Sequence, residues 1–90
     1  MEKYYENNDM QELYEKISGI IAKKIPDTKV EISPDKNLIK DLGADSLSIV
    51  DIVMGTEDTF GISIPDSDFE KLNTVGDCVK FAYEKIYNKK

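Results

Sequence analysis

A turn that ends in a serine, followed by a long apolar segment, decides the fold of this chain. The turn, residues 41–47, reads Asp41-Leu42-Gly43-Ala44-Asp45-Ser46-Leu47. The apolar segment continues from Leu47 to Met54. Serine is a preferred residue at helix N-termini, where its hydroxyl can cap the first turn. The sequence therefore predicts a helix that begins at Ser46 and leaves the serine accessible, with capping as the simplest alternative role for its hydroxyl.

The predicted helix spans residues 46–60, and its apolar residues cover a wide arc. Leu47, Val50 and Met54 form one stripe, and other apolar residues fill much of the remaining surface: Ile49, Ile52, Val53 and Phe60. Such an arc is typical of a central helix that several neighbours contact. Gly55 inside the helix either permits a close approach by another element or is a tolerated defect. Gly61 is placed to end the helix.

Upstream, apolar residues at helical spacing predict a first helix that Asn8 or Asp9 can cap and that Pro26 ends at Ile25. Its apolar positions are Leu13, Ile17, Ile20, Ile21 and Ile25. Residues 1–8 are expected to be a frayed tail. A long connection follows, residues 27–45, and a connection this long often has a functional role.

Within this connection, the alternation of Val30 and Ile32 with polar residues indicates a very short strand. Residues 33–35 are typical of a turn. Leu38, Ile39 and Leu42 are expected to enter the core.

Downstream of the predicted helix, Asp66 can cap a short helical turn that continues through Phe69 to Leu72. Thr74 can cap a last helix. The apolar face of this last helix consists of Val75, Cys78, Val79, Ala82 and Ile86. Cys78 on that face is expected to be buried and inert. The basic end, residues 88–90, is expected to fray.

These elements predict an all-α fold: a small bundle of three main helices plus one short helix, with a long loop between the first and second main helices. The length, 90 residues, is that of one small domain. The sequence shows neither a signal peptide nor a membrane-spanning run. We therefore expect a single domain over residues 1–90, without membrane insertion, located in the cytoplasm.

The composition excludes several kinds of site. The chain has no histidine and one cysteine, Cys78. Histidine is the usual general base near neutral pH and a common metal ligand, so Ser46 cannot form a Ser-His-Asp triad. The acidic residues around Ser67 lack the glycine and glutamate of a calcium loop. No catalytic residue and no metal site are predicted, and an independent enzyme is disfavoured.

The acidic residues are concentrated around Ser46. The net charge is −6, and residues 41–70 contain eight acidic residues and no lysine. The remainder carries 12 lysines against 10 acidic residues, or +2. Such a surface repels nucleic acid and attracts basic protein patches. The alternative is an ordinary solvated acidic face.

The motif at Ser46 resembles the attachment motif of acyl carrier proteins. The likeness extends from about Leu13 to Ile86 and includes the segments 64–66 and 74–77, which read Ile64-Pro65-Asp66 and Thr74-Val75-Gly76-Asp77. The resemblance implies a right-handed antiparallel helical bundle. It also implies that Ser46 carries covalent 4′-phosphopantetheine, transferred from coenzyme A by a phosphopantetheinyl transferase.

The resemblance further implies which residues surround the attachment site and meet partner enzymes. Gly43, Asp45 and Leu47 would flank the phosphopantetheine on Ser46. The implied partner contacts are Asp41, Asp45, Leu47, Ser48, Asp51, Met54, Glu57 and Asp58. The implied partners are acyl-loading, condensing and reducing enzymes with basic docking patches, which would bind a monomeric carrier.

The sequence leaves three functions open. The first is a carrier of acyl thioesters for fatty-acid synthesis. The second is a dedicated carrier for a polyketide, an amino acid or another specialised acyl group, because Ser48 stands where fatty-acid carriers usually have an acidic residue. The third is an unmodified module that binds partners through its acidic face.

Overall fold

The computed structural model describes residues 3–26 and 30–87. The sequence predicted frayed ends that include residues 1–2 and 88–90, and these lie outside the described residues. Within these two ranges the chain forms three α-helices and one short 3₁₀ helix: α1 (Asn8–Lys24), α2 (Ser46–Phe60), η1 (Asp66–Lys71) and α3 (Val75–Tyr87). The predicted all-α fold, with three main helices, one short helix and a long loop after the first helix, is confirmed.

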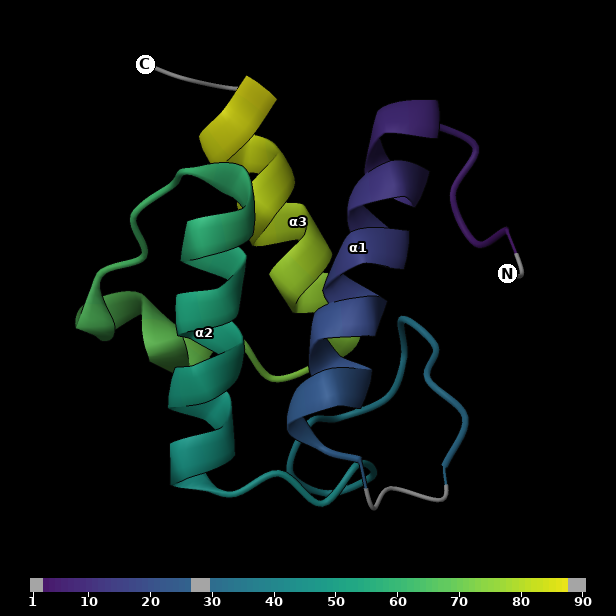
Figure 1. The fold of residues 1–90 in the computed structure, drawn as a ribbon. Helices are drawn as coiled ribbons and strands as arrows, with labels where there is room; N and C mark the ends of the chain where they lie inside the picture. The colour runs from purple at the N-terminus through teal and green to yellow at the C-terminus, as the bar shows by residue number, and fades with distance from the viewer. Residues whose placement is uncertain (1–2, 27–29, 88–90) are drawn as a thin grey trace.

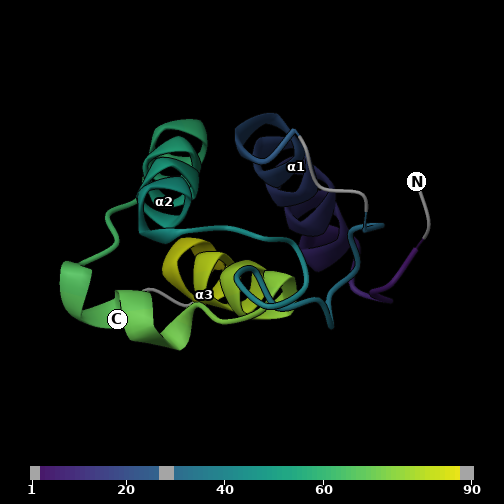
Figure 2. The ribbon, with the colours of Figure 1, turned by 90° about the horizontal axis from the view of Figure 1, so that it is seen from below.

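The helices form a bundle in which α1 runs opposite to both α2 and α3 (Figure 1). Seen from below, α1 and α2 lie side by side above α3, and η1 lies outside the bundle (Figure 2). Helix α1 packs against both other long helices. The sequence predicted that residues 46–60 would be the central helix, but α1 has that position.

Side-chain burial explains why α1 is central. Leu13, Tyr14, Ile17 and Ile21 of α1 are buried, and Ile17 and Ile21 have no exposed surface. The side-chain oxygen of Asn7 caps α1 by accepting hydrogen bonds from the amides of Asp9 and Met10. The cap thus lies one residue before the predicted Asn8, and the helix ends at Lys24, with Ile25 as its C-cap immediately before Pro26.

The N-terminal residues before α1 pack instead of fraying. The Gln11 side-chain oxygen accepts hydrogen bonds from the amides of Tyr4 and Tyr5 at 2.9 Å and 3.0 Å. The rings of Tyr4 and Tyr5 then lie 5.1 Å and 5.8 Å from the ring of Tyr14. The buried Gln11 therefore folds the tail back onto α1, and the prediction that residues 1–8 fray is wrong for this part of the tail.

The long loop is fastened to the start of α3. The amide of Leu38 donates to the carbonyl of Asn73, and the amide of Val75 donates to the carbonyl of Lys36. Asn37 and Thr74 form the only β-bridge in the described part of the chain. The predicted strand at Val30 and Ile32 is wrong, since the described residues 30–32 form a bend and irregular chain instead.

The loop enters the core less completely than predicted. Leu38 and Leu42 are buried, but Ile39 is 61% exposed. The side chain of Asn37 accepts hydrogen bonds from the amides of Ile39 and Lys40, which closes a turn over residues 37–41. Neighbouring residues in such a turn point in different directions. Leu38 therefore faces the core and Ile39 faces solvent.

The two C-terminal helices, η1 and α3, largely match the prediction from the sequence. Thr74 caps α3: its hydroxyl accepts from the Asp77 amide, while the Asp77 carboxylate accepts from the Thr74 amide. Asp66 does not cap η1, since it is the first helical residue and Pro65 precedes it without a side-chain cap. Cys78 is buried, and this burial raises the pKa of its thiol to about 12, with a smaller contribution from Asp77. Such a thiol stays protonated and inert near neutral pH.

Candidate functional site

The site is the N-terminus of α2, where Ser46 is the first helical residue. Asp45, rather than Ser46, is the N-cap, and its side-chain Oδ1 accepts a hydrogen bond from the Ser48 amide at 2.8 Å. Ser46 is exposed, and within the described residues its hydroxyl makes no hydrogen bond. The alternative in which Ser46 is only a helix cap is therefore wrong, and its hydroxyl is available for modification.

The backbone before Ser46 turns tightly at Gly43. Gly43 has a φ of +78°, a left-handed conformation that residues with a side chain rarely adopt. The neighbouring Leu42 and Ala44 are buried, and the Ala44 amide donates to the Leu38 carbonyl. The buried Leu42 and Ala44 thus hold the turn in place, and the chain that follows has Asp45 and Ser46 exposed at the surface.

The carboxylates of Asp41 and Asp45 each accept a hydrogen bond from a nearby backbone amide. The Asp41 Oδ2 atom accepts from the Asn37 amide at 2.7 Å, which reinforces the turn over residues 37–41. Hydrogen bonds from the Ser48 amide and then from the Ser48 side chain lower the pKa of the Asp45 carboxyl. Both acidic residues remain exposed, so they position the Ser46 segment and also present negative charge beside it.

Exposed apolar side chains extend from Ser46 along α2. Leu47 is 76% exposed and Met54 is 55% exposed, and Val50 also faces solvent. Leu47, Asp51, Met54 and Asp58 are separated by four, three and four residues, which places them on one face of the helix. We call this face, with Val50, the α2 stripe.

Two of the predicted partner contacts lie away from the centre of the α2 stripe. Glu57 is partly buried, and its Oε2 atom accepts from the Ile64 amide at 2.7 Å. This bond ties the loop after α2 back onto the helix. Ser48 is also partly buried at the edge of the stripe. Helical spacing therefore gathers Leu47, Asp51, Met54 and Asp58 on one surface, with Asp45 at the N-cap of the same helix, and leaves Glu57 and Ser48 at its margins.

Sequence reasoning missed two exposed apolar residues near the site. Val50 was recognised as part of an apolar stripe but was not assigned to the partner surface, and Ile39 was assigned to the core. Val50 lies three residues from Leu47 and four from Met54, so its helical spacing could have placed it with them. For Ile39, the available signal was Asn37, since an asparagine side chain often closes a turn by accepting a hydrogen bond from a backbone amide that follows it in the chain.

The described residues give no sign of other chemistry at this site. Within residues 3–26 and 30–87, no group of three metal-ligating side chains comes together. None of the helices in the same ranges has the length and apolar content to span a lipid bilayer. A phosphate on Ser46 would fit, because the positive end of the α2 dipole stabilises a negative group at the first helical residue.

Comparison with known proteins identifies the family. Residues 15–82 match the family described as "Phosphopantetheine attachment site". An acyl carrier protein of Thermotoga maritima is 41% identical over 76 residues, which cover 84% of this chain and 94% of that protein. An acyl carrier protein of Helicobacter pylori is 44% identical over 69 residues, covering 77% of this chain and 88% of that protein.

Solved structures agree with the sequence comparison. A crystal structure of an acyl carrier protein from Thermotoga maritima superimposes with a TM-score of 0.76 at 25% identity, covering 93% of this chain and 98% of the other. A putative acyl carrier protein from Mycobacterium tuberculosis gives a TM-score of 0.70 at 32% identity, covering 76% and 90%. The chain therefore belongs to the acyl carrier protein family, whose members are carriers rather than enzymes and use 4′-phosphopantetheine as their cofactor.

Proposed function

We propose that Ser46 is the residue to which 4′-phosphopantetheine is attached, within a single carrier domain that spans residues 1–90. The observation that carries the proposal is the exposed Ser46 hydroxyl at the start of α2, left without a hydrogen bond in the described structure because Asp45 supplies the cap. A Cβ added to Gly43, three residues before Ser46, would meet no atom within 4 Å, so the turn that leads to the serine is open to a transferase.

The attachment reaction follows from the chemistry of the donor. In the transferase, the Ser46 oxygen attacks the pyrophosphate of coenzyme A. A phosphodiester forms at that oxygen, and adenosine bisphosphate leaves. The transferase removes the hydroxyl proton, since this chain has no histidine to do so. The attached group supplies a thiol on a flexible arm, which holds acyl groups as thioesters. The residues of this chain position the arm and present it to partners.

The α2 stripe is the proposed docking surface for these partners. Acyl carriers interact with a phosphopantetheinyl transferase and with acyl-handling enzymes in general. We propose that Leu47 and Met54 enter apolar depressions on these enzymes, while Asp45, Asp51 and Asp58 pair with basic residues around them. Long-range attraction between opposite charges would speed the encounter. The proposed setting is the cytoplasm, and the proposed pathway is fatty-acid synthesis through loading, condensing and reducing enzymes.

Ser48 favours a second candidate, a dedicated carrier of another acyl group. An acidic residue at this position would add a charge to the stripe, whereas Ser48 is neutral and partly buried. A partner that depends on that charge would bind this chain less well. The acyl group that the protein carries in its own cells distinguishes the two candidates.

Intact-mass spectrometry after incubation with coenzyme A and a phosphopantetheinyl transferase tests the attachment. The wild type is expected to gain the mass of one phosphopantetheine, and Ser46→Ala is expected to gain nothing. Ser48→Ala is the matched control, because it removes a hydroxyl two residues away and should still be modified. An unmodified wild type would leave only the acidic interaction module, and a modified Ser46→Ala would move the site elsewhere.

A further inference from the structure

One exposed hydrophobic side chain outside the α2 stripe lies in the segment that leads to Ser46. Among the described residues, Leu47 and Ile39 are the two most exposed large hydrophobic side chains, at 76% and 61%. Leu47 follows Ser46 directly, whereas Ile39 belongs to the turn over residues 37–41. Removing an isoleucine side chain from water is favourable. A partner that covers Ile39 would therefore gain binding energy from it.

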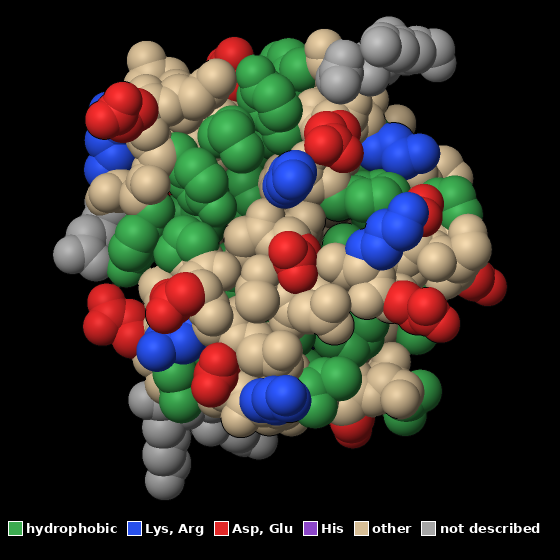
Figure 3. All heavy atoms as spheres, turned by 180° about the vertical axis from the view of Figure 1, so that it is seen from behind, with side chains coloured by type: hydrophobic (Ala, Val, Ile, Leu, Met, Phe, Trp, Pro, Cys, Tyr) green, Lys and Arg blue, Asp and Glu red, His purple; other side chains and the backbone are tan. Residues whose placement is uncertain are grey.

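Other hydrophobic side chains at the surface have packing partners within the chain. On the face seen from behind, hydrophobic side chains gather between α3 and the N-terminal residues (Figure 3). Tyr5, Met10 and Tyr83 in this area pack against the core, and the ring centroids of Tyr83 and Tyr87 lie 4.9 Å apart. Ile39 differs from them, because it is not one of the described side chains that pack against the core. Its surface is available to a partner.

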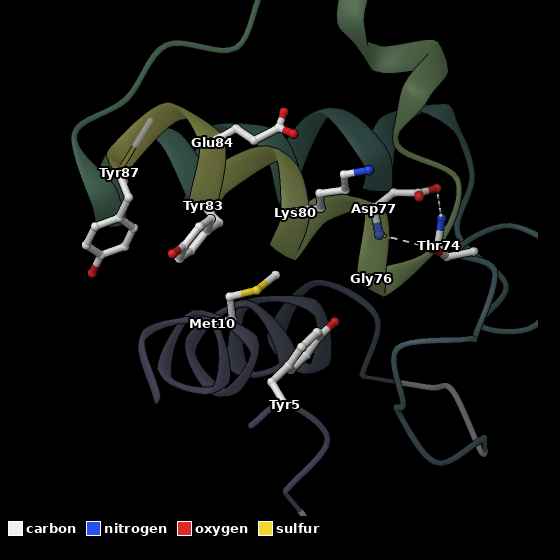
Figure 4. Close-up of a pocket in the computed structure, with 9 residues that line it drawn as sticks. All are labelled: Tyr5, Met10, Thr74, Gly76, Asp77, Lys80, Tyr83, Glu84 and Tyr87. Atoms are coloured by element: carbon white, nitrogen blue, oxygen red, sulfur yellow. Dashed lines mark hydrogen bonds between the residues drawn. The ribbon is translucent and has the colours of Figure 1, made fainter. Parts of the chain in front are cut away.

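Hydrogen bonds hold Ile39 in place at the surface. The Asn37 side-chain oxygen accepts from the Ile39 amide at 3.0 Å. Asn37 is in turn joined by the β-bridge to Thr74, at the start of α3. Figure 4 shows the two hydrogen bonds between Thr74 and Asp77 that fix this end of α3. The turn thus has a firm support, and a partner would not have to order the backbone of Ile39 on binding.

One hydrogen bond ties this turn to the segment that carries Ser46. The Leu38 carbonyl, which precedes Ile39, accepts from the Ala44 amide at 2.8 Å. With standard bond lengths, this contact limits the distance between the Cα atoms of Ile39 and Ser46 to roughly 15 Å or less. The chain that leads into α2 crosses the lower end of the bundle in Figure 1, and this end faces the viewer in Figure 2. Ile39 and Ser46 therefore belong to the same end of the molecule.

Attachment and later acyl transfer place different demands on the surface around Ser46. In attachment, the reacting atom is the Ser46 oxygen itself, which has to enter the active site of the transferase. In the later reactions, the reacting atom is the thiol at the far end of a flexible arm, so those enzymes can dock further from the serine. A specific interface covers about 800 Å² on each partner, which corresponds to a circle of about 16 Å radius. A transferase centred on Ser46 would therefore reach Ile39.

We propose that Ile39 is a contact residue for the phosphopantetheinyl transferase. Together with Leu47, it places a hydrophobic side chain on the chain before and after the serine. This inference rests on the proposed attachment to Ser46. The matching feature of the transferase is a hydrophobic depression beside the site that accepts the serine. Ile39 serves the attachment reaction, whereas the later docking of acyl-handling enzymes depends on the α2 stripe.

Steady-state kinetics with coenzyme A and a phosphopantetheinyl transferase test this assignment. Ile39→Ala should lower kcat/KM for the unmodified protein about five-fold or more, mainly through a higher KM, because a binding contact is lost while the reacting groups are unchanged. Ile39→Glu should lower it further, since a carboxylate would lie against an apolar surface. Tyr87→Ala is the matched control. It removes another exposed hydrophobic side chain, on α3, and should leave kcat/KM unchanged.

The fully modified Ile39→Ala protein provides the second measurement. Its acylation by an acyl-loading enzyme should proceed at the wild-type rate, because the α2 stripe is intact. Urea unfolding checks that Ile39→Ala and Ile39→Glu keep the fold. Both variants are expected to be about as stable as the wild type, since the side chain that changes is mostly exposed.

Three results would overturn the proposal. An unchanged kcat/KM in Ile39→Ala and Ile39→Glu would show that the transferase does not contact this residue. An equal loss in Tyr87→Ala would show that the effect is not specific to this end of the molecule. An equal loss in the acylation of the modified protein would make Ile39 a general docking residue. A wild type that is never modified is a different failure, because it would remove the proposed attachment to Ser46 itself.

Discussion

Helices α1 and α2 have similar lengths but opposite relations to the core. Helix α1 spans 17 residues, carries many charges and is the element around which the bundle packs. Helix α2 spans 15 residues and is the more apolar of the two, yet only Ile52, Val53 and Thr56 are buried in it. The apolar residues that α2 leaves exposed are therefore not needed for folding. Because they start beside Ser46, we infer that they serve binding.

The largest expected effect is a difference in stability between the two helices. Ile17→Ala in α1 should lower the free energy of unfolding by about 3 kcal/mol, because it leaves a cavity at a fully buried position. Leu47→Ala in α2 should change it by about 0.5 kcal/mol or less, since Leu47 is mostly exposed. Urea unfolding of both variants provides the comparison. Similar losses in both would mean that the stripe is part of the core.

A smaller effect is expected from the glycines inside the two helices. Gly19 of α1 faces open space, so Gly19→Ala should gain up to about 1 kcal/mol of stability from helix propensity. A Cβ on Gly55 of α2 would lie 3.1 Å from the Ile20 Cγ2 atom. Ile20 is β-branched and cannot move freely, so Gly55→Ala should gain clearly less. Thermal unfolding of the two variants measures the difference, and equal gains would show that Gly55 is a tolerated defect.

The cap of α2 should make its N-terminus sensitive to acid. In the folded state, the pKa of the Asp45 carboxyl lies below its ordinary value of 3.8. The ionised carboxylate therefore stabilises the folded state at pH values above 3.8. This contribution is lost as the pH falls below 3.8 toward the folded-state pKa. Asp45→Asn should therefore show a weaker loss of melting temperature across that range than the wild type. An identical pH profile for both proteins would contradict the assignment of Asp45 as the cap.

The smallest expected effect is that of salt on the acidic region. Asp51 and Asp58 form no ion pair among the described residues, and no lysine occurs between residues 41 and 70. Their mutual repulsion should be screened by added salt, so sodium chloride should raise the melting temperature. The double variant Asp51→Asn with Asp58→Asn should show a smaller rise. A wild-type melting temperature that stays constant or falls would indicate that these carboxylates are too far apart to interact.

The parts of the fold that depend on local signals were predictable from the sequence. The bounds of α2 were predicted correctly because a polar turn precedes it and Gly61, with a φ of +65°, ends it. The cap of α3 by Thr74 was also predictable from its position. The choice between Asp45 and Ser46 as the cap of α2 was not, since both residue types are good caps and stand side by side.

The parts that depend on distant contacts were not predictable. The attachment of the loop to α3 uses backbone bonds of Lys36 and Leu38, which no side-chain pattern reveals. The N-terminal tail packs because of one buried glutamine, Gln11. A glutamine among the apolar positions of α1 was the available signal, but it does not indicate which amides the side chain binds.

The position of the candidate site at the start of α2 was predictable, and its extent less so. The motif around Ser46 and the absence of histidine together indicated a serine that is modified by another enzyme. Exposure of Leu47 and Met54 also follows the expected partner surface. The hydrogen bond that the Glu57 carboxylate accepts from the Ile64 amide depends on how the loop after α2 folds. Helical spacing alone could not have shown that Glu57 is partly buried whereas Asp58 is exposed.

The most direct test of the central claim is fragment mass spectrometry of the protein purified from its own cells. The account predicts that phosphopantetheine is found on the fragment containing Ser46, with an acyl group on its thiol. The mass of that acyl group would separate a fatty-acid carrier from a specialised one. A protein that is recovered unmodified, or modified on a fragment without Ser46, would contradict the account.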